Sequence, residues 1–416
     1  MVLAVFVMTF SVTLLFFAIF TSLLVTCLRE AEDMKIIPEG YNPDIPPMIN
    51  NLPSSVYIAC QILGIDEINE ATMDFHLILG LIAVWKDPRL HIAHLVSKHP
   101  VIFPSNLVSK IWKPDLGYPN TKKVEAFEET SKISVVKILS DGSLFAAIRI
   151  NFLVDCPMEL HNYPIDVQIC KFYIGLATNT DKEISVEWMG ERSSPYRHLG
   201  KSIQVRNMHL LKYETDEIKA KKVTQVWVSG NFTVLIAEFK FKRRLTGNLM
   251  NVYIPSTLVV MLSWLSFWID VHAAPARITL GVTSILTLVT HLVQSRSFVP
   301  PVDYLKALDI WFIFCIAAIF LSLLEYAFAY QSVITVKEEK EVQTPALESD
   351  QKKKKFSTTV KGWMSHLKDI KNTLIVSKHI NAYDKVSRYI FPFVFINFVS
   401  FYWLYYLGHR YFHSEM

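Results

Sequence analysis

The sequence lacks the signatures of common enzymes and of nucleic-acid-binding proteins. Its 416 residues contain no Gly-x-Ser-x-Gly, no His-Glu-x-x-His and no Gly-x-x-x-x-Gly-Lys, so no activated serine, catalytic zinc or phosphate-binding loop is indicated. The 42 Lys and Arg residues nearly balance 38 Asp and Glu residues, and the net charge of +4 is too small and too scattered for nucleic-acid binding. Cysteines number only five, and no Cys/His spacing of a closed zinc site accompanies the histidines. We therefore expect no enzymatic activity, metal ion, cofactor or nucleic-acid partner.

Hydrophobic residues, in contrast, are abundant. They make up 51% of the chain against 19% charged residues, and the mean hydropathy of +0.28 is that of a membrane protein. A transmembrane helix needs roughly 17 to 25 apolar residues. Five segments meet or approach this length: residues 1–28, 249–269, 278–295, 308–330 and 389–408. The first has no charged residue and is predicted to be a signal peptide, with a retained anchor helix as the alternative.

Residues 29–246 contain no segment apolar enough to span a membrane, which predicts a water-soluble domain. β-branched and aromatic residues predict a strand in residues 232–242, and residues 133–154 are typical of two strands around the turn Asp141-Gly142. Many short strands at regular spacing favour a β-sandwich. The expected fold is an extracellular antiparallel β-sandwich followed by four transmembrane helices, the first three within residues 247–330.

The orientation in the membrane follows from residues 331–388. This loop contains 12 Lys and Arg residues against 7 Asp and Glu residues, and the positive-inside rule places it in the cytosol. Its residues 337–355 are polar and are expected to be flexible. Apolar residues at helical spacing between Val360 and Ile375 predict an amphipathic helix, either a membrane-hugging connector or a partner site. The last span, 389–408, returns an extracellular tail, 409–416, to the side of the sandwich.

Two cysteines of the exported domain, Cys156 and Cys170, enclose 13 residues that include two prolines. An oxidising compartment favours their pairing. Closing a loop of about 15 residues stabilises a fold by roughly 3 kcal/mol in the chain-entropy model. From spacing alone, the loop is either an ordinary structural staple or a functional element.

The second span has a polar stripe. At 100° per residue, one helix face contains Thr279, Thr283, Leu286, Thr290 and Gln294. Such hydroxyls either pack against neighbouring helices or contact water, and a ring of identical subunits could form a pore from this helix. In that ring Leu286 would form a hydrophobic gate that closes by dewetting.

Charge around this span predicts the permeant ion. Arg277 and Arg296 bracket the helix and are expected to bring positive charge to both mouths of the pore. No Asp or Glu occurs between Asp270 and Asp303, so no carboxylate ring is available to a cation. The expected permeant ion is an anion. The alternatives are a cation channel, whose flanking arginines do not face the pore, and a non-conducting bundle in which the threonines only pack.

A series of motifs resembles the Cys-loop family of pentameric ligand-gated ion channels, most closely its anion-selective, glycine- and GABA-receptor-like branch. In the exported domain the series comprises Trp112-Lys113-Pro114-Asp115, the cysteine loop with its tip Tyr163-Pro164-Ile165-Asp166, and Arg243. In the spans it comprises residues 253–256, 262–269, 273–283 and 304–311. The resemblance covers residues 50–330 and, by position, the last span.

The resemblance implies a homo- or heteropentamer in the lipid bilayer of the plasma membrane, opened by an extracellular small-molecule ligand bound between subunits. It implies that chloride is the permeant ion, because cation channels of the family have a glutamate at the position of Pro275 and Ala276. It places the gate at Leu286. It assigns coupling between ligand binding and pore opening to a set of residues that includes Tyr163, Pro164, Asp166, Arg243 and Lys306.

Ligand recognition departs from the family pattern, in which an aromatic box binds an amine by cation–π contact. The positions that match the box and the face opposite it are Trp227, Ser229, Phe232, Tyr118, Ala177, Gly80 and Arg149. Ala177 and Gly80 replace aromatic residues, and Ile82 replaces the arginine that binds a carboxylate in the glycine-receptor branch. These replacements speak against amino-acid transmitters and favour a larger or amphipathic ligand. The alternative is a decayed site in an accessory subunit that functions only beside others.

One glycosylation sequon, Asn231-Phe232-Thr233, is present in the exported domain. Asn231 is therefore a predicted glycan acceptor, although Phe232 lies next to the expected ligand pocket.

Overall fold

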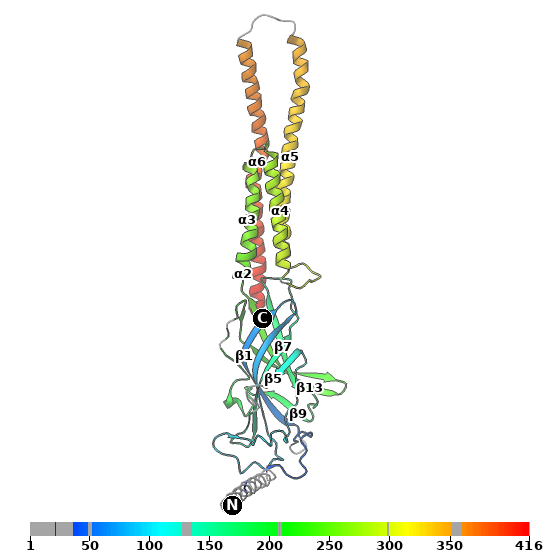
Figure 1. Ribbon diagram of the computed structural model, residues 1–416, viewed down its shortest axis with the longest axis vertical. Coiled ribbons are helices and arrows are strands. Elements are labelled where there is room, and N and C mark those ends of the chain that lie inside the picture. The colour runs from blue at the N-terminus through cyan, green and yellow to red at the C-terminus, as the bar shows by residue number, and fades with distance from the viewer. Residues whose placement is uncertain are drawn as a thin grey trace, which may run out of the picture.

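The computed structural model describes residue 21 and residues 36–48, 52–126, 135–206, 208, 210–297, 299–351 and 360–415. Figure 1 shows an elongated molecule with a β-sandwich at one end and long helices at the other. Two helices, α5 (Ala307–Gln351) and α6 (Val360–Glu415), extend farthest from the sandwich, and the C-terminus returns to the junction of the two parts. The predicted signal peptide, residues 1–28, lies outside the described residues apart from Thr21.

The sandwich consists of two sheets. The first has the order β10-β1-β2-β7-β6-β3, with β5 paired to β7 and β9 paired to β1. Its strands are β1 (Ser54–Asn69), β2 (Asp74–Trp85), β3 (Val101–Ile102), β5 (Thr121–Ala126), β6 (Val135–Ile138), β7 (Leu144–Asp155), β9 (Ile184–Trp188) and β10 (Ile203–Val205). The second has the order β11-β13-β8-β4, with β12 paired to β13. Its strands are β4 (Leu116–Gly117), β8 (Val167–Leu176), β11 (Tyr213–Thr215), β12 (Lys219–Trp227) and β13 (Gly230–Arg243).

The predicted β-sandwich is confirmed, with one difference in strand direction. The strand expected in residues 232–242 is the main part of β13, and the two strands expected around Asp141-Gly142 are β6 and β7. Most neighbours are antiparallel as expected, but β1 pairs in parallel with both β9 and β10. Those parallel pairs join segments far apart in the sequence, so no local turn signal announces them.

Period-two alternation builds the core between the sheets. In β2, alternate residues from Phe75 to Leu81 are buried and face the second sheet. In β13, Phe239 and Phe241 are likewise buried, and both rings lie 5.5 Å from the ring of Phe75. These edge-to-face aromatic contacts between β2 and β13 hold the two sheets together.

Four helices are long and apolar enough to cross a membrane: Thr246–Trp268, Ala274–Arg296, Ala307–Ser332 and Tyr383–Phe412. The first comprises α2 (Thr246–Asn248), a π-helical turn (Leu249–Tyr253), α3 (Ile254–Trp264) and a 3₁₀ turn (Leu265–Trp268). Pro255 accounts for the π-helical turn, because it lacks an N–H and its ring excludes the carbonyl of residue 251 from ordinary helical bonding. The second span is α4 (Ala274–Arg296), and the third and fourth are parts of α5 and α6.

The helices continue beyond the predicted spans. The segment expected to be cytosolic and flexible is helical as far as Gln351, since α5 is continuous from Ala307. Likewise, α6 is one helix from Val360 to Glu415, so residues 409–415 of the predicted tail are the last part of the fourth helix. A polar sequence can remain helical when it prolongs a helix already nucleated in the membrane, because adding a residue costs less than starting a new helix.

Candidate functional site

The predicted polar stripe lies on a face of α4 that the subunit leaves uncovered. Thr279, Thr283, Thr290 and Gln294 are exposed, and the side chain of Leu286 is 62% exposed. The opposite face of α4 is buried by its own subunit and contains Arg277, Gly281, Ser284 and Leu288. The stripe is therefore not explained by packing within the subunit.

The threonine hydroxyls of this stripe need no partner on another helix. Thr279 Oγ1 donates to Pro275 O (2.6 Å), and Thr283 Oγ1 donates to Thr279 O (2.7 Å). Thr290 Oγ1 donates to Thr287 O (2.8 Å). Such bonds satisfy the hydroxyls in an apolar environment. Each hydroxyl group can also rotate and donate its hydrogen to an anion instead.

The N-terminus of α4 carries the positive end of the helix dipole, and the nearest preceding carboxylate, that of Asp270, is exposed and accepts the His272 N–H (3.2 Å). Ala273 is the N-cap, no side chain caps this end, and the first turn contains no acidic residue. Pro275 and Ala276 are exposed there. A helix N-terminus carries roughly half a positive charge, so this end of α4 attracts anions.

The expected placement of Arg277 is wrong. Its side chain is 1% exposed and points into the helix bundle. It donates to Ile269 O (2.9 Å from Nε) and to both oxygens of Asp384 on α6 (3.0 and 2.9 Å). Because Asp384 neutralises it, Arg277 does not bring free positive charge to the mouth of a pore.

The arginine at the other end of α4 is placed differently. The side chain of Arg296 is 54% exposed, and its NH2 atom lies 3.2 Å from Asp309 Oδ1. Asp309 also lies 3.6 Å from Lys306 Nζ, which is buried. Two cations thus share Asp309, and a second carboxylate, Asp303, is exposed in the same linker.

Arg243, the last residue of β13, lies in a buried cluster where the sandwich meets the helices. It donates to both oxygens of Asp166 in the cysteine loop (2.7 and 3.2 Å) and to Glu70 at the β1–β2 turn. The Tyr213 hydroxyl donates to the same Glu70 oxygen (2.8 Å). The rings of Tyr163 and Tyr213 lie 4.7 Å from the guanidinium carbon. One cation therefore ties together the cysteine loop, the β1–β2 turn and the entry to the first span.

The electrostatics of this cluster keep its ions charged. Burial alone would raise the pKa of Glu70, but attraction and hydrogen bonding by Arg243 lower that pKa below its ordinary value. Burial likewise disfavours charged Arg243, yet Asp166 outweighs it and raises the pKa of the guanidinium. Burial raises the pKa of Tyr163 and Tyr213, so both stay neutral.

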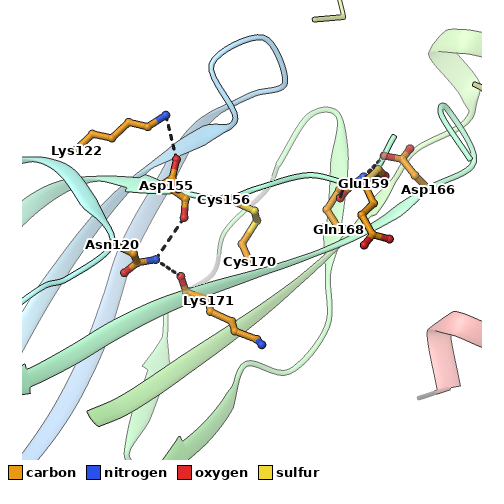
Figure 2. Close-up of a disulfide and its surroundings, with 9 residues drawn as sticks. All are labelled: Asn120, Lys122, Asp155, Cys156, Glu159, Asp166, Gln168, Cys170 and Lys171. Carbon is orange, nitrogen blue, oxygen red and sulfur yellow. Dashed lines mark hydrogen bonds and ion pairs between the residues drawn. A yellow bond between two sulfur atoms is a disulfide. The ribbon is translucent and has the colours of Figure 1, made fainter. Parts of the chain in front are cut away.

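The predicted disulfide between Cys156 and Cys170 is present and links the end of β7 to β8, which belong to different sheets (Figure 2). Asn120 reinforces this link, because its Nδ2 atom donates to Asp155 O (3.3 Å) and to Lys171 O (2.6 Å). Within the loop, Gln168 Nε2 donates to Asp166 Oδ2 (2.6 Å) and fixes the carboxylate that binds Arg243. The loop is thus held rigidly at its base and oriented at its tip.

The tip of the cysteine loop caps the third span. The N–H groups of Ala307 and Leu308, which begin α5, donate to the carbonyl oxygens of His161 (2.8 Å) and Tyr163 (3.1 Å). The ring of His161 stacks on Tyr304 at 3.8 Å, in the linker between α4 and α5. A displacement of the loop must therefore move the linker that follows α4. Pro164 lies within this tip and precedes the buried Ile165.

The end of α6 reaches the same junction. The side chain of Asn162, in the cysteine loop, lies 3.2 Å from His409 Nδ1. Arg410 NH2 donates to Arg243 O (2.9 Å). The predicted tail is therefore part of the junction and not a separate segment.

Three loops of the second sheet converge where ligand residues were expected. The hairpin between β12 and β13 presents Trp227, whose side chain is 62% exposed, and the adjacent Ser229 is exposed. The Asp181 N–H donates to Asn231 O (2.9 Å), which ties the loop after β8 to this hairpin. The Ala177 N–H donates to Asp115 O (3.0 Å), which ties the same loop to the region of β4. Ser229 and Ala177 thus lie on connected, exposed loops. Trp227 and Asn231 are exposed at the adjoining ends of β12 and β13, and Phe232 of β13 is half-buried.

Tyr118 is half-buried and its ring packs towards the core, so its role as a ligand contact stays a prediction that the loop contacts above do not support. Its ring lies 4.6 Å from Phe152 and 5.9 Å from Phe172, two fully buried core residues. Burial raises the pKa of its hydroxyl. Gly117, one residue earlier, lies beside Ala177 instead: a Cβ on Gly117 would lie 3.4 Å from the Ala177 Cβ.

The remaining predicted ligand residues lie on the first sheet. Gly80 of β2 is directly opposite Arg149 of β7 on one side and Gln61 of β1 on the other. Residues directly opposite each other on neighbouring strands point to the same face of a sheet, so Gln61 and Arg149 lie on either side of Gly80, which has no side chain. Both Gln61 and Arg149 are exposed. The two predicted sets of ligand residues thus lie on different sheets, and a pocket between subunits would unite them.

Two protein-family models match the chain. The model of the neurotransmitter-gated ion-channel ligand binding domain matches residues 31–245, and the model of the neurotransmitter-gated ion-channel transmembrane region matches residues 252–348. The chain belongs to the neurotransmitter-gated ion-channel family. Neurotransmitter-gated channels are pentameric ligand-gated channels of the lipid bilayer and not enzymes. Within the described residues, no group of three His, Cys, Asp or Glu side chains is arranged to bind a metal ion.

Several charged partners in this neurotransmitter-gated channel could not be identified from the sequence. Glu70 lies 173 residues from Arg243, and no periodicity connects them. Asp384 lies 107 residues from Arg277. The burial of Arg277, however, had a signal: it falls at helical spacing with Gly281, Ser284 and Leu288, on the face opposite the threonine stripe.

Proposed function

We propose that this neurotransmitter-gated channel conducts anions, chloride in particular, through a pore lined by the threonine stripe of α4 from five subunits. The inner end of α4 supports the proposal best. Pro275 and Ala276 are exposed there, the helix N-terminus is uncapped, and the sequence has no carboxylate between Asp270 and Asp303. An entering cation would meet five positive helix ends and no carboxylate within α4, the nearest being that of Asp270 before the N-cap.

The arginines contribute unequally to the proposed selectivity. Arg277 is paired with Asp384 in the bundle, so it adds little field to the pore. Arg296 is half exposed and shares Asp309 with Lys306, so its charge is only partly neutralised by that carboxylate. Selectivity at the inner mouth therefore depends on the helix N-termini around Pro275 and Ala276. A cation channel of the family would have a glutamate at this position.

Leu286 is proposed as the gate. Its exposed side chain lies between Thr283 and Thr290 on the stripe, so a ring of five leucines would form an apolar constriction between two polar rings. Such a constriction excludes water and ions when narrow.

The ligand site is proposed to lie between the sandwiches of neighbouring subunits, on the extracellular side of the plasma membrane. One subunit contributes the loops with Trp227, Ser229, Phe232 and Ala177, and its neighbour contributes the sheet face around Gly80 and Arg149. Small residues at Ala177 and Gly80 leave room for a large or amphipathic ligand, and Trp227 offers an aromatic face. Homomeric and heteromeric pentamers both satisfy this arrangement.

Coupling is proposed to pass through the cluster of Arg243 and the cysteine loop. Movement of the ligand-facing loops reaches Arg243 along β13, since the hairpin and Arg243 are the two ends of one strand. Asp166 and Tyr163 then transmit it to the linker around Lys306. Asn231 is proposed as a glycan acceptor, because its side chain is exposed on the strand next to the hairpin.

The decisive experiment is the reversal potential of a channel that opens without ligand. Leu286→Thr makes the apolar ring polar and should give current in cells that express only this chain. Lowering external chloride tenfold should shift the reversal potential by about +59 mV, the value for a monovalent ion. Val289→Thr makes a similar apolar-to-Thr change on α4 beside the stripe, at a side chain that is 39% exposed, and should stay closed.

Two outcomes would overturn the proposal. A reversal potential that follows sodium would make the channel cation-selective despite the absence of a carboxylate ring. Surface expression of Leu286→Thr without any current would favour an accessory subunit that conducts only with partners.

A further inference from the structure

The segment that leads from the first span into α4, residues 267–273, is held by side chains of α4, α5 and α6. Hydrogen bonds from these side chains end on three carbonyl oxygens at alternate residues, those of Phe267, Ile269 and Val271. Ala273, the last residue of the segment, is the N-cap of α4, and the exposed Pro275 and Ala276 follow it. The position of the segment therefore determines where the N-terminus of α4 lies.

Arg388 of α6 holds the first of these carbonyls. Its Nε and NH2 atoms donate to Phe267 O at 3.1 and 2.8 Å, and its guanidinium carbon lies 5.1 Å from the centre of the Trp268 ring. The ring of Phe267 also lies 5.1 Å from that of Phe391, one turn farther along α6. Because a charged donor makes a stronger hydrogen bond than a neutral one, α6 fixes the start of the segment firmly.

Arg277 holds the second carbonyl and is itself held by α6. Its Nε and NH2 atoms both donate to Ile269 O (2.9 Å from Nε). Its NH1 and NH2 atoms also donate to the two carboxylate oxygens of Asp384, at 3.0 and 2.9 Å, and both side chains are almost fully buried. Since the guanidinium is a rigid planar fork, Asp384 fixes the direction from which Arg277 reaches Ile269.

Tyr326 of α5 lies against the last part of the segment. Its hydroxyl donates to Val271 O in a long hydrogen bond of 3.5 Å, and its side chain packs with Val271 and Ala274 in a small apolar cluster. The same ring lies 5.3 Å from the guanidinium carbon of Arg277. α5 therefore supports both the segment and the arginine that binds it.

The segment makes few backbone hydrogen bonds that could hold it in place. The Ile269 N–H donates to Ser266 O (3.2 Å), and the Ala273 N–H donates to Asp270 O (3.0 Å). A connection with so few bonds of its own keeps one conformation only where contacts from outside offset the entropy of ordering it. The contacts from α5 and α6 supply that order.

We propose that Asp384 and Arg388 are positioning residues for the inner mouth of the pore, acting through residues 267–273. Arg388 holds the first carbonyl directly, and Asp384 holds the second through Arg277. The inference rests on the proposed pore, in which Pro275 and Ala276 line this mouth. Both positioning residues are on α6, which packs against α5 and the 3₁₀ turn after α3, so they set the width of the mouth without contacting a permeating ion.

The test measures distances between spin labels on neighbouring subunits by double electron–electron resonance, on the full-length pentamer in nanodiscs. Ala276→Cys carries the label, Cys27 is replaced by Ser, and the free Cys60 and Cys315 are buried and therefore unreactive. We expect a narrow distance distribution in this chain. Arg388→Met and Asp384→Asn should each broaden it, because the segment loses a charged hydrogen bond or the partner that orients one. Arg388→Lys, which keeps the charge and one donor, should give an intermediate width.

Lys385→Met is the matched control. Lys385 is exposed on α6, one residue after Asp384, and among the described residues it donates to none of the three carbonyls. Lys385→Met removes the same charge from the same end of α6 as Arg388→Met, and it should leave the distribution unchanged. A second label site, Gln294→Cys near the outer end of α4, should keep a narrow distribution in every variant.

Equal widths at residue 276 in Arg388→Met and Lys385→Met would overturn the proposal, as would a broad distribution before either change is made. Broadening at residue 294 as large as that at residue 276 would also refute it, because the whole bundle would then be loosened. The distances are measured without current. A channel that conducts cations, or none, therefore contradicts the proposed selectivity and leaves this comparison intact.

Discussion

Neutralising Asp166 should weaken the junction between the sandwich and the helices. Asp166 accepts two hydrogen bonds from Arg243, at 2.7 and 3.2 Å, and both side chains are almost fully buried. Removing one partner of a buried ion pair costs about 3–5 kcal/mol. In Asp166→Asn the amide keeps one acceptor, and Glu70 still pairs with Arg243, so we expect a smaller loss of about 2–3 kcal/mol.

The assay is the thermal unfolding midpoint of the purified full chain. For a domain of this size, 1 kcal/mol shifts the midpoint by about 2–4 °C, so Asp166→Asn should lower it by about 5–10 °C. The matched control is Asp216→Asn, which breaks an ion pair of 2.9 Å to Lys242, the neighbour of Arg243. Asp216 is 41% exposed in its side chain, so its pair should contribute under about 1 kcal/mol.

The comparison of the two variants decides whether burial matters. If both lower the midpoint equally, the cluster is not stabilised by its buried geometry and the reasoning fails. The same holds if Asp166→Asn has no effect. Raising the salt concentration should reduce the Asp216 effect and leave the Asp166 effect largely intact, because buried pairs are poorly screened.

Three further outcomes follow from the described contacts. Glu70 has a lowered pKa, so it stabilises the fold at neutral pH and loses that contribution as the pH falls through its folded pKa. In Glu70→Gln the thermal unfolding midpoint should therefore fall less steeply between pH 7 and pH 3 than in the native chain. Asp384→Asn leaves the buried Arg277 with a weakened partner and should reduce surface expression, measured by labelling of intact cells, whereas Asp384→Glu should retain more of it. Gly281→Ala places a Cβ 2.2 Å from Leu323 Cδ2, so it should destabilise the helix bundle by about 1–3 kcal/mol, and Leu323→Ala should restore much of the loss in a thermal assay.

The exposed and the buried faces of α4 show how far local pattern reaches. The threonine stripe was predicted from helical periodicity, and the structure leaves that face uncovered by its own subunit. The same periodicity places Arg277 on the opposite face, but the sequence-based interpretation treated it only as a charge at the end of the span. Its partner Asp384 lies on another helix 107 residues away, so only the folded helix bundle shows that the charge is neutralised.

The loops of the sandwich show a second limit. Ala177 was found by counting from Cys170 and Trp227 by the pattern of its own stretch, and both are exposed where a ligand was expected. Tyr118 was also found by counting, but its ring packs on Phe152 and Phe172 in the core. A count of residues gives the position of a backbone, whereas the direction of a side chain depends on which strand neighbours leave room for it.

The sequence by itself determined the membrane class, the β-sandwich, the four spans, the disulfide and the family, because each of these depends on composition, on periodicity or on motifs that are contiguous in the chain. Tertiary structure alone decided that Glu70 and Asp166 share Arg243, that α6 ends against the cysteine loop, and that Asp384 neutralises Arg277. These features join residues that are distant in sequence. Burial makes their charges strongly interacting, and burial is a property of the packed chain and not of any local segment.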